Sequence, residues 1–164
     1  MNKKKIFIAV DTNKISRAKR IIKDTQTNKI KVGYKFGLEF FYSKDGRKFL
    51  SNLKNQTIFL DLKLNDIPNT IKSALKSLKD LKISYMTVHL SSGFSALKTL
   101  KKDNKGIKIA GVTTLTSLNN KDLKEIGYNK KVNELVRHQA KLATKAKLDA
   151  IVCSGHEIRS VKRV

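Results

Sequence analysis

Two charged residues, Asp61 and Lys63, interrupt an otherwise apolar segment that begins at position 57, and Asp66 follows three positions later. The β-branched and aromatic residues of this segment predict a strand, in which side chains two apart point the same way. We therefore expect the Asp61 carboxylate and the Lys63 ammonium to share one face. Charges on the inner face of a sheet are costly unless they are paired, so this pattern indicates a paired or functional group. Neighbouring carboxylates favour the protonated form of a lysine, which could then donate a proton.

A second lysine, Lys31, lies in the preceding predicted strand, 29–33. Neighbouring strands lie about 4.8 Å apart, so we expect the Lys31 ammonium to reach the Asp61 carboxylate. The prediction is a row of alternating charges made by Lys31, Asp61, Lys63 and Asp66. Taken alone, an Asp-x-Lys pattern is also typical of a buried ion-pair cluster, or of surface charges at a strand end.

Short apolar runs rich in β-branched residues alternate along the chain with longer amphipathic segments, which is typical of βα units around a parallel sheet. The predicted strands are 5–10, 29–33, 57–62, 83–89, 107–112 and 150–153. Two segments, 66–80 and 131–147, place apolar residues at helical spacing and are expected to cover the sheet as helices. Because the chain shows no linker and no repeat, the sequence predicts a single domain over residues 1–164.

Six βα units in 164 residues correspond to about 27 residues per unit, and eight such units need on the order of 220. The sequence therefore predicts an α/β fold of the TIM (β/α)8-barrel type, with only about six of the eight βα units present. An open, doubly wound sheet is the alternative. Its dinucleotide-binding form needs a glycine-rich first turn, whereas Asp11, Thr12 and Asn13 follow the first predicted strand.

The chain carries 36 Lys and Arg residues against 13 Asp and Glu, which gives a formal net charge of +23. Such a charge is typical of basic RNA-binding proteins, whose affinity depends strongly on salt. The lysines are scattered through every predicted helix, however, and aromatic residues are not interleaved with them. This distribution favours a solvated surface and disfavours nucleic acid as the partner.

Cys153 is the only cysteine, so no internal disulfide and no cysteine-rich zinc site are expected, and a buried apolar role is favoured over a nucleophile. The apolar run after the basic N-terminus is interrupted by Asp11. We therefore expect no export signal, no membrane span and a cytoplasmic protein. His138 and His156 have no partner at metal-ligand spacing, so no metal site is predicted. His89 could be either a core histidine or a ligand contact.

The string Asp61-Leu62-Lys63-x-x-Asp66-Ile67-Pro68-Asn69-Thr70, preceded by Lys31-Val32-Gly33 and by Asp11, resembles the orotidine 5'-monophosphate decarboxylase family. The resemblance continues through Val88-His89, Val112-Thr113-Thr114-Leu115-Thr116-Ser117 and Val152-Cys153-Ser154, and so covers essentially the whole chain. The Asp-x-Lys-x-x-Asp core is shared with sugar-phosphate barrels of the 3-keto-gulonate 6-phosphate decarboxylase and hexulose 6-phosphate synthase types. The Ile-Pro-Asn-Thr continuation points to the nucleotide enzyme.

The resemblance implies decarboxylation of orotidine 5'-monophosphate to uridine 5'-monophosphate, a carboxy-lyase reaction of pyrimidine synthesis that passes through a carbanion at pyrimidine carbon 6. It implies no metal and no organic cofactor. Lys63 would protonate the carbanion, Asp61 would lie against the departing carboxylate, and Lys31 would hold Asp61 and touch the ribose. The implied catalytic group is Lys63, Asp61, Lys31 and Asp66.

The resemblance also implies contacts outside this group. Asp11 would accept a ribose hydroxyl, and Thr116 and Ser117 would meet the nucleotide near its base, although strand-end hydroxyls commonly cap helices instead. Three residues would reach across an interface into the site of a neighbouring subunit: Asp66, Ile67 and Thr70. A homodimer with shared active sites is thus implied.

The family binds the substrate's phosphate with segments that follow strands seven and eight, and no counterpart of them occurs in these 164 residues. The resemblance therefore implies a C-terminally truncated barrel. Because remote phosphate binding often contributes to the chemical step, the turnover and affinity of the chain as it stands are expected to be low.

Overall fold

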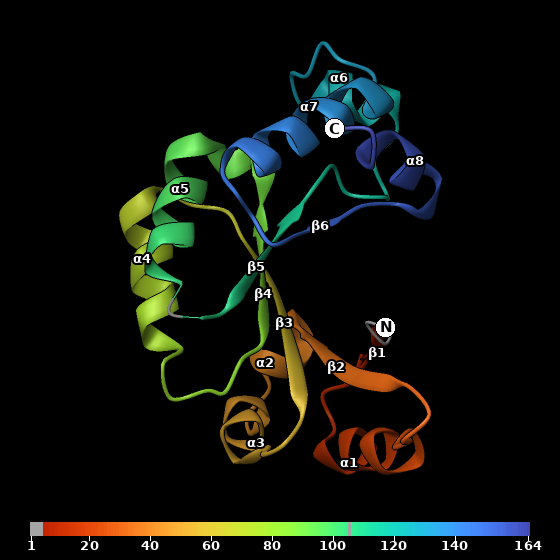
Figure 1. Cartoon of the computed structure of the whole chain (residues 1–164), viewed down its shortest axis with the longest axis vertical. Coiled ribbons are helices and arrows are strands. Elements are labelled where there is room, and N and C mark those ends of the chain that lie inside the picture. The colour runs from red at the N-terminus through yellow and green to blue at the C-terminus, as the bar shows by residue number, and fades with distance from the viewer. Residues whose placement is uncertain (1–4, 105) are drawn as a thin grey trace. The chain divides into compact units, whose positions relative to one another are not determined.

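The computed structural model describes residues 5–104 and 106–164. Six strands form one sheet in the order β1-β2-β3-β4-β5-β6 (Figure 1). The strands are β1 Lys5–Ala9, β2 Lys31–Gly37, β3 Thr57–Leu64, β4 Tyr85–His89, β5 Lys108–Val112 and β6 Ala150–Val152. The α-helices and 3-10 helices (η) are α1 Ile15–Asp24, α2 Leu38–Phe41, α3 Gly46–Asn52, α4 Pro68–Ser77, η1 Leu90–Ser92, α5 Gly93–Asp103, α6 Asn120–Glu125, α7 Val132–Lys145, η2 Gly155–Glu157 and α8 Ile158–Val161.

The strands follow one another across the sheet in chain order. The pairs β1 with β2, β2 with β3, and β5 with β6 are all parallel. A doubly wound sheet reverses its strand order at a switch point, whereas a barrel keeps the order of the chain. The prediction of six βα units of a (β/α)8 barrel is therefore confirmed, and the doubly wound alternative is excluded.

Strand β2 differs most from its predicted bounds. It was expected at 29–33 and is observed at Lys31–Gly37, so it runs four residues further along the chain. Tyr34 and Phe36 are fully buried and continue the alternation of apolar residues past Gly33. An expected bound at the first glycine was therefore wrong, because the side chains that pack against the core follow that glycine.

The predicted helices over 66–80 and 131–147 are present but shorter, as α4 and α7. Pro68 opens α4, because the fixed φ of proline suits a first helical turn and its missing N–H is not needed there. No helix in the part of the chain that the structure describes is long and apolar enough to cross a membrane.

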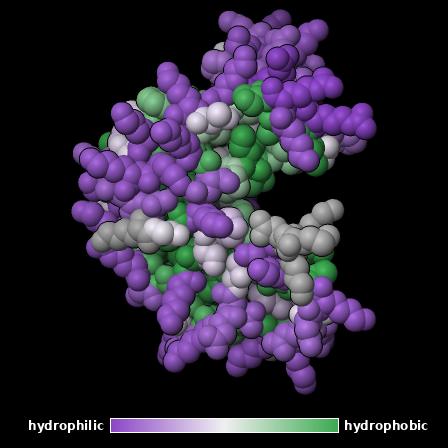
Figure 2. Space-filling view, in the orientation of Figure 1, coloured by the Kyte–Doolittle hydropathy of each residue, from purple (hydrophilic) through white to green (hydrophobic). Residues whose placement is uncertain are grey.

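Contacts between residues divide the chain into two compact units. The first comprises Met1–Leu62 and Lys76–Met86, and the second comprises Lys63–Leu75 and Thr87–Val164. Figure 2 shows hydrophilic residues spread over the helices of each unit on the visible face. The single domain over 1–164 stays a prediction.

Aromatic rings pack against one another in the first unit in two groups. In one group, ring centroids lie 4.8 to 6.4 Å apart among Phe36, Phe40 and Phe49. In the other, they lie 5.0 to 5.7 Å apart among Phe7, Phe59 and Tyr85. The first group fastens β2 to α2 and α3, and the second joins β1, β3 and β4, so these contacts hold the strands of the first unit together.

Polar contacts fasten the second unit at the amino ends of its strands. The Asp149 carboxylate accepts hydrogen bonds from the Lys101 ammonium at 2.6 and 2.7 Å and from the Ile109 N–H at 2.8 Å. These contacts join α5, β5 and the residue before β6. Helices α4 and α5 lie side by side, with the Lys72 ammonium 3.0 Å from the Asp103 carboxylate (Figure 1).

We expect Asp149→Asn to lower the free energy of unfolding by about 1–2 kcal/mol at pH 7, because it removes a charge-assisted hydrogen bond. Burial raises the pKa of Asp149, but hydrogen bonds from Lys101 and the Ile109 N–H outweigh burial and bring that pKa below its usual value. The carboxylate's contribution is therefore present above a pH of about 4 and lost as the pH falls through the folded-state pKa. Urea unfolding at pH 7 and pH 3 should show the difference between the proteins shrinking in acid.

The matched control is Glu125→Gln. Glu125 lies 3.8 Å from Lys121, and both side chains are mostly exposed. Such surface pairs contribute little, so we expect a change below about 0.5 kcal/mol at either pH. Equal losses in the two variants would contradict the role given to Asp149.

Candidate active site

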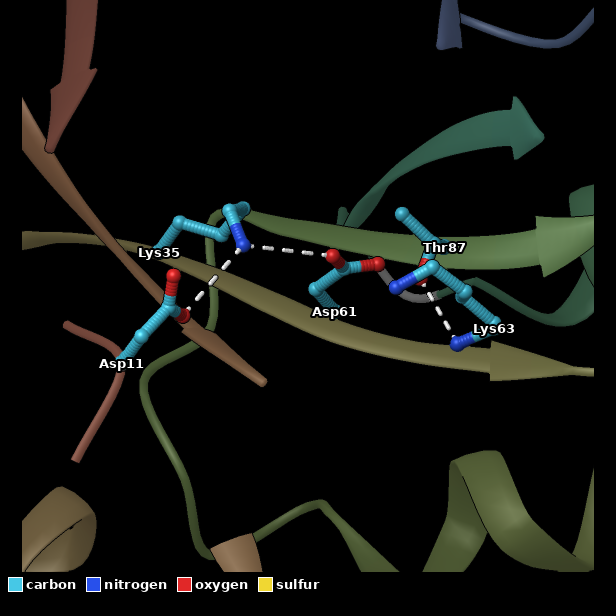
Figure 3. A network of polar contacts seen from close by, with 5 residues as sticks. All are labelled: Asp11, Lys35, Asp61, Lys63 and Thr87. Atoms are coloured by element: carbon cyan, nitrogen blue, oxygen red, sulfur yellow. Dashed lines mark hydrogen bonds and ion pairs between the residues drawn. The ribbon is translucent and has the colours of Figure 1, made fainter. Parts of the chain in front are cut away.

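A lysine joins two carboxylates at the carboxyl ends of β1, β2 and β3 in the first unit. The Lys35 ammonium lies 3.4 Å from the Asp61 carboxylate and 3.8 Å from the Asp11 carboxylate (Figure 3). Asp61 is 8% exposed, whereas most of the Asp11 side chain is open to solvent. One ammonium group thus pairs with a buried carboxylate and with a solvated one, and the solvated Asp11 carboxylate remains accessible to a ligand.

The expected pair between Lys31 and Asp61 was wrong. Lys31 is the first residue of β2, is exposed, and lies opposite Lys5 in the register of β1 and β2. Gly37 is the residue of β2 that lies opposite Asp61. Since side chains alternate along a strand, Lys35 has the same facing as Lys31 but lies four residues nearer to that level. The prediction failed because it ended the strand too early.

In the second unit, Lys63 adopts an unusual backbone conformation for a strand residue. Its φ is +49°, in the left-handed region. Its N–H donates to the Thr87 hydroxyl oxygen at 2.8 Å, and Thr87, on β4, is fully buried (Figure 3). The simple alternation that would place Lys63 on the same face as Asp61 assumes extended residues, so that shared face stays a prediction.

The segment between β3 and α4 and the first turn of α4 present their predicted residues to solvent. Asp66, Ile67 and Thr70 are all exposed, with 65% of Ile67 open to solvent. The Asp66 carboxylate accepts the Ile67 N–H at 2.7 Å. An apolar side chain held open at such a turn is available to a partner, which is what the predicted role across a subunit interface requires.

Asn65, which the sequence analysis did not single out, anchors the same segment. Its side-chain oxygen accepts hydrogen bonds from the hydroxyls of Ser91 at 3.3 Å and Ser92 at 3.0 Å. The end of β3 is thereby tied to η1, which follows β4. No sequence pattern marks Asn65, because its partners lie 26 and 27 residues away.

The segment after β5 carries the predicted base-binding residues Thr116 and Ser117, and both are exposed. Its first residues are fixed from α7, because the Gln139 side-chain oxygen accepts the Thr114 N–H at 2.8 Å and the Thr114 hydroxyl at 3.2 Å. Both Thr114 and Gln139 are buried. Gln139 occupies the apolar stripe of 131–147, and this polar interruption was a sequence feature that could have indicated its role.

A pocket of about 210 Å³ in the second unit lies among these segments. Its polar lining comes from the ends of β3, β4 and β5 and from α7, namely Asn65, His89, Ser91, Thr113, Thr114 and Gln139. In barrels, the loops at the carboxyl ends of the strands form the active site. His89 therefore lines a pocket at the functional end of its strand.

Two further expectations concern metal and thiol chemistry. Across residues 5–104 and 106–164, no three potential His, Cys, Asp or Glu ligands gather closely enough to hold a metal ion. Burial and the charge of Glu157 raise the pKa of the Cys153 thiol. A thiol of that kind stays protonated near neutral pH, which does not suit a nucleophile.

The sheet consists of sequential βα units and carries ionisable residues at the carboxyl ends of its strands. This arrangement is typical of (β/α)8-barrel enzymes, which place their active sites at that end. Residues 4–164 match the family model described as Orotidine 5'-phosphate decarboxylase / HUMPS family. The chain belongs to this family.

Curated relatives agree with the family match. The chain is 35% identical to an orotidine 5'-phosphate decarboxylase of Carboxydothermus hydrogenoformans, over 98% of this chain and 70% of the relative. It is 41% identical to one of the Wolbachia from Brugia malayi, over 95% of this chain and 70% of the relative. The chain thus spans about 70% of the length of these relatives.

Solved structures agree as well. A conserved protein of Geobacillus kaustophilus matches with a TM-score of 0.85 and 30% identity, over 96% of this chain and 77% of that one. An orotidine 5'-phosphate decarboxylase of Lactobacillus acidophilus matches with a TM-score of 0.81 and 28% identity, over 96% and 75%. These likenesses support the fold and the family assignment.

We expect Lys35→Met to lower the free energy of unfolding by about 1–2 kcal/mol, because it removes the cation beside the buried Asp61 carboxylate. Lys31→Met is the matched control, since Lys31 lies on the same strand and is exposed. A surface change of that kind should stay within about 0.5 kcal/mol. Urea unfolding of both variants provides the measurement, and equal losses would return Lys31 to consideration.

Proposed function

We propose that this chain carries the decarboxylating centre that converts orotidine 5'-monophosphate to uridine 5'-monophosphate in pyrimidine synthesis. The observation that supports this most is the contact of Lys35 with both Asp61 and Asp11. Lys63 follows Asp61 by two residues in β3. The strand ends supply two cations and two carboxylates. Charges of both signs suit a reaction in which one anionic group leaves and another negative charge develops.

In the proposed reaction, the bond between pyrimidine carbon 6 and the substrate carboxylate breaks. Carbon dioxide leaves, and the electron pair stays on carbon 6. The Lys63 ammonium stabilises this charge and then transfers a proton to carbon 6, which gives uridine 5'-monophosphate. The neutral amine regains its proton from water. The proposed steps need no metal and no organic cofactor.

Lys35 takes the role that the sequence analysis gave to Lys31. Its contact with the buried Asp61 orients that carboxylate next to the departing group. Its second contact, with Asp11, leaves the solvated Asp11 carboxylate ready to accept a ribose hydroxyl. Lys31 is given no part in the reaction.

The exposed segments support the remaining assignments. Thr116 and Ser117 are proposed to contact the base, since both are exposed after a segment that Gln139 fixes. Three exposed residues are proposed to enter the site of a second subunit, so that the enzyme acts as a cytoplasmic homodimer: Asp66, Ile67 and Thr70.

The test follows the loss of absorbance as orotidine 5'-monophosphate is consumed, with and without a chelator. It compares the chain, a version extended to the length of the curated relatives, and Lys63→Ala in each. We expect turnover that resists the chelator, is higher in the extended version, and falls by roughly 10²–10⁴ in Lys63→Ala because the proton donor is lost.

Lys121→Ala is the matched control, because the Lys121 side chain is 84% exposed and lies outside the strand ends. It should keep the parent turnover. Full activity in Lys63→Ala would remove Lys63 from the reaction. No turnover in either folded version, together with a magnesium-dependent reaction of a sugar phosphate, would move the assignment to the sugar-phosphate branch of the family.

A further inference from the structure

Lys63 holds a backbone conformation that strand residues with a side chain rarely adopt. Its φ is +49° within β3, whereas extended strands have φ near −120°. The left-handed region brings Cβ close to the following carbonyl oxygen, so residues other than glycine enter it only where their surroundings hold them there. Within residues 5–104 and 106–164, two other such residues exist, Asn55 and Lys147, and both lie outside the strands.

The N–H of Lys63 has a side-chain acceptor, whereas ladder groups of a parallel sheet normally donate to backbone carbonyls. It donates at 2.8 Å to the side-chain oxygen of Thr87 (Figure 3). Thr87 is fully buried on β4, so its side chain has little freedom to move away. A fixed acceptor on a buried strand residue therefore holds the peptide plane between Leu62 and Lys63, and the φ of Lys63 sets its side chain relative to that plane.

We infer that Thr87 is a positioning residue, whose hydroxyl fixes the peptide before the left-handed Cα of Lys63 and so directs the Lys63 ammonium towards the substrate carbon. This inference rests on the proposed function, in which Lys63 donates the proton. A change of more than 150° between an extended φ and +49° swings the lysine side chain to another direction, as expected from the positions of the two regions. A fixed peptide plane and a left-handed φ together set where the proton donor points.

The effect should appear in the chemical step. Charge stabilisation and proton transfer at carbon 6 occur in the transition state, whereas the Asp11 and Lys35 contacts already act on bound substrate. Loss of the Thr87 acceptor should therefore lower kcat and leave KM nearly unchanged. A residue that only stabilised the fold would lower the temperature of unfolding without separating these two constants.

The decisive variants are Thr87→Val and Thr87→Ser. Valine keeps the branched shape and fits a buried strand but lacks the oxygen, so the variant should fold. We expect its kcat to fall tenfold or more with KM within about twofold, and we expect Thr87→Ser, which keeps the oxygen, to recover most of the loss. The assay uses the version of the protein that turns over orotidine 5'-monophosphate.

Amide hydrogen exchange at Lys63 provides a second readout that does not need turnover. Exchange should be faster in Thr87→Val than in the parent protein, and Thr87→Ser should restore the parent rate, because a hydrogen-bonded N–H exchanges slowly. If neither folded version shows turnover, the proposed function fails, while this comparison still decides whether Thr87 fixes the backbone at Lys63. Parent exchange in Thr87→Val, or parent kcat where turnover is measurable, overturns it.

Discussion

The contact between Lys35 and Asp61 requires that β2 and β3 pair in one particular register. A carboxylate as buried as Asp61 needs a cation, and that cation must come from the adjacent strand at the right level. The level is fixed by the register in which Gly37 faces Asp61, and the register is fixed in turn by aromatic packing on both sides of β2 and β3. The apolar core thereby decides which lysine can serve the carboxylate.

Much of the fold could be predicted from the sequence, because it depends on local patterns. Six apolar runs separated by amphipathic segments gave six strands in chain order, and the helices over 66–80 and 131–147 were found near their observed bounds. Register could not be predicted in the same way. Lys31 and Lys35 have the same facing on β2, so only the true end of the strand distinguishes them, and that end depends on how Tyr34 and Phe36 pack.

The residues that hold the candidate site in place were harder to predict than the residues that act in it. Asp61, Lys63 and Asp66 stand out because charge is unusual beside an apolar strand. Thr87 is an ordinary strand residue and Asn65 an ordinary loop residue, and their importance appears only through partners more than 20 residues away. A sequence pattern shows which groups can react, whereas their support depends on long-range geometry that periodicity does not record.

Gln139 bears on how this chain could be engineered. An optimisation that completes the apolar stripe of α7 would choose leucine at this position, since the side chain is buried and its neighbours on the stripe are Leu135, Val136, Ala140 and Ala143. The substitution would add apolar contact while leaving the N–H and hydroxyl of Thr114 without their acceptor. A more stable helix would then be obtained together with a less ordered loop after β5. Thermostability at this position therefore conflicts with order in the segment that carries Thr116 and Ser117.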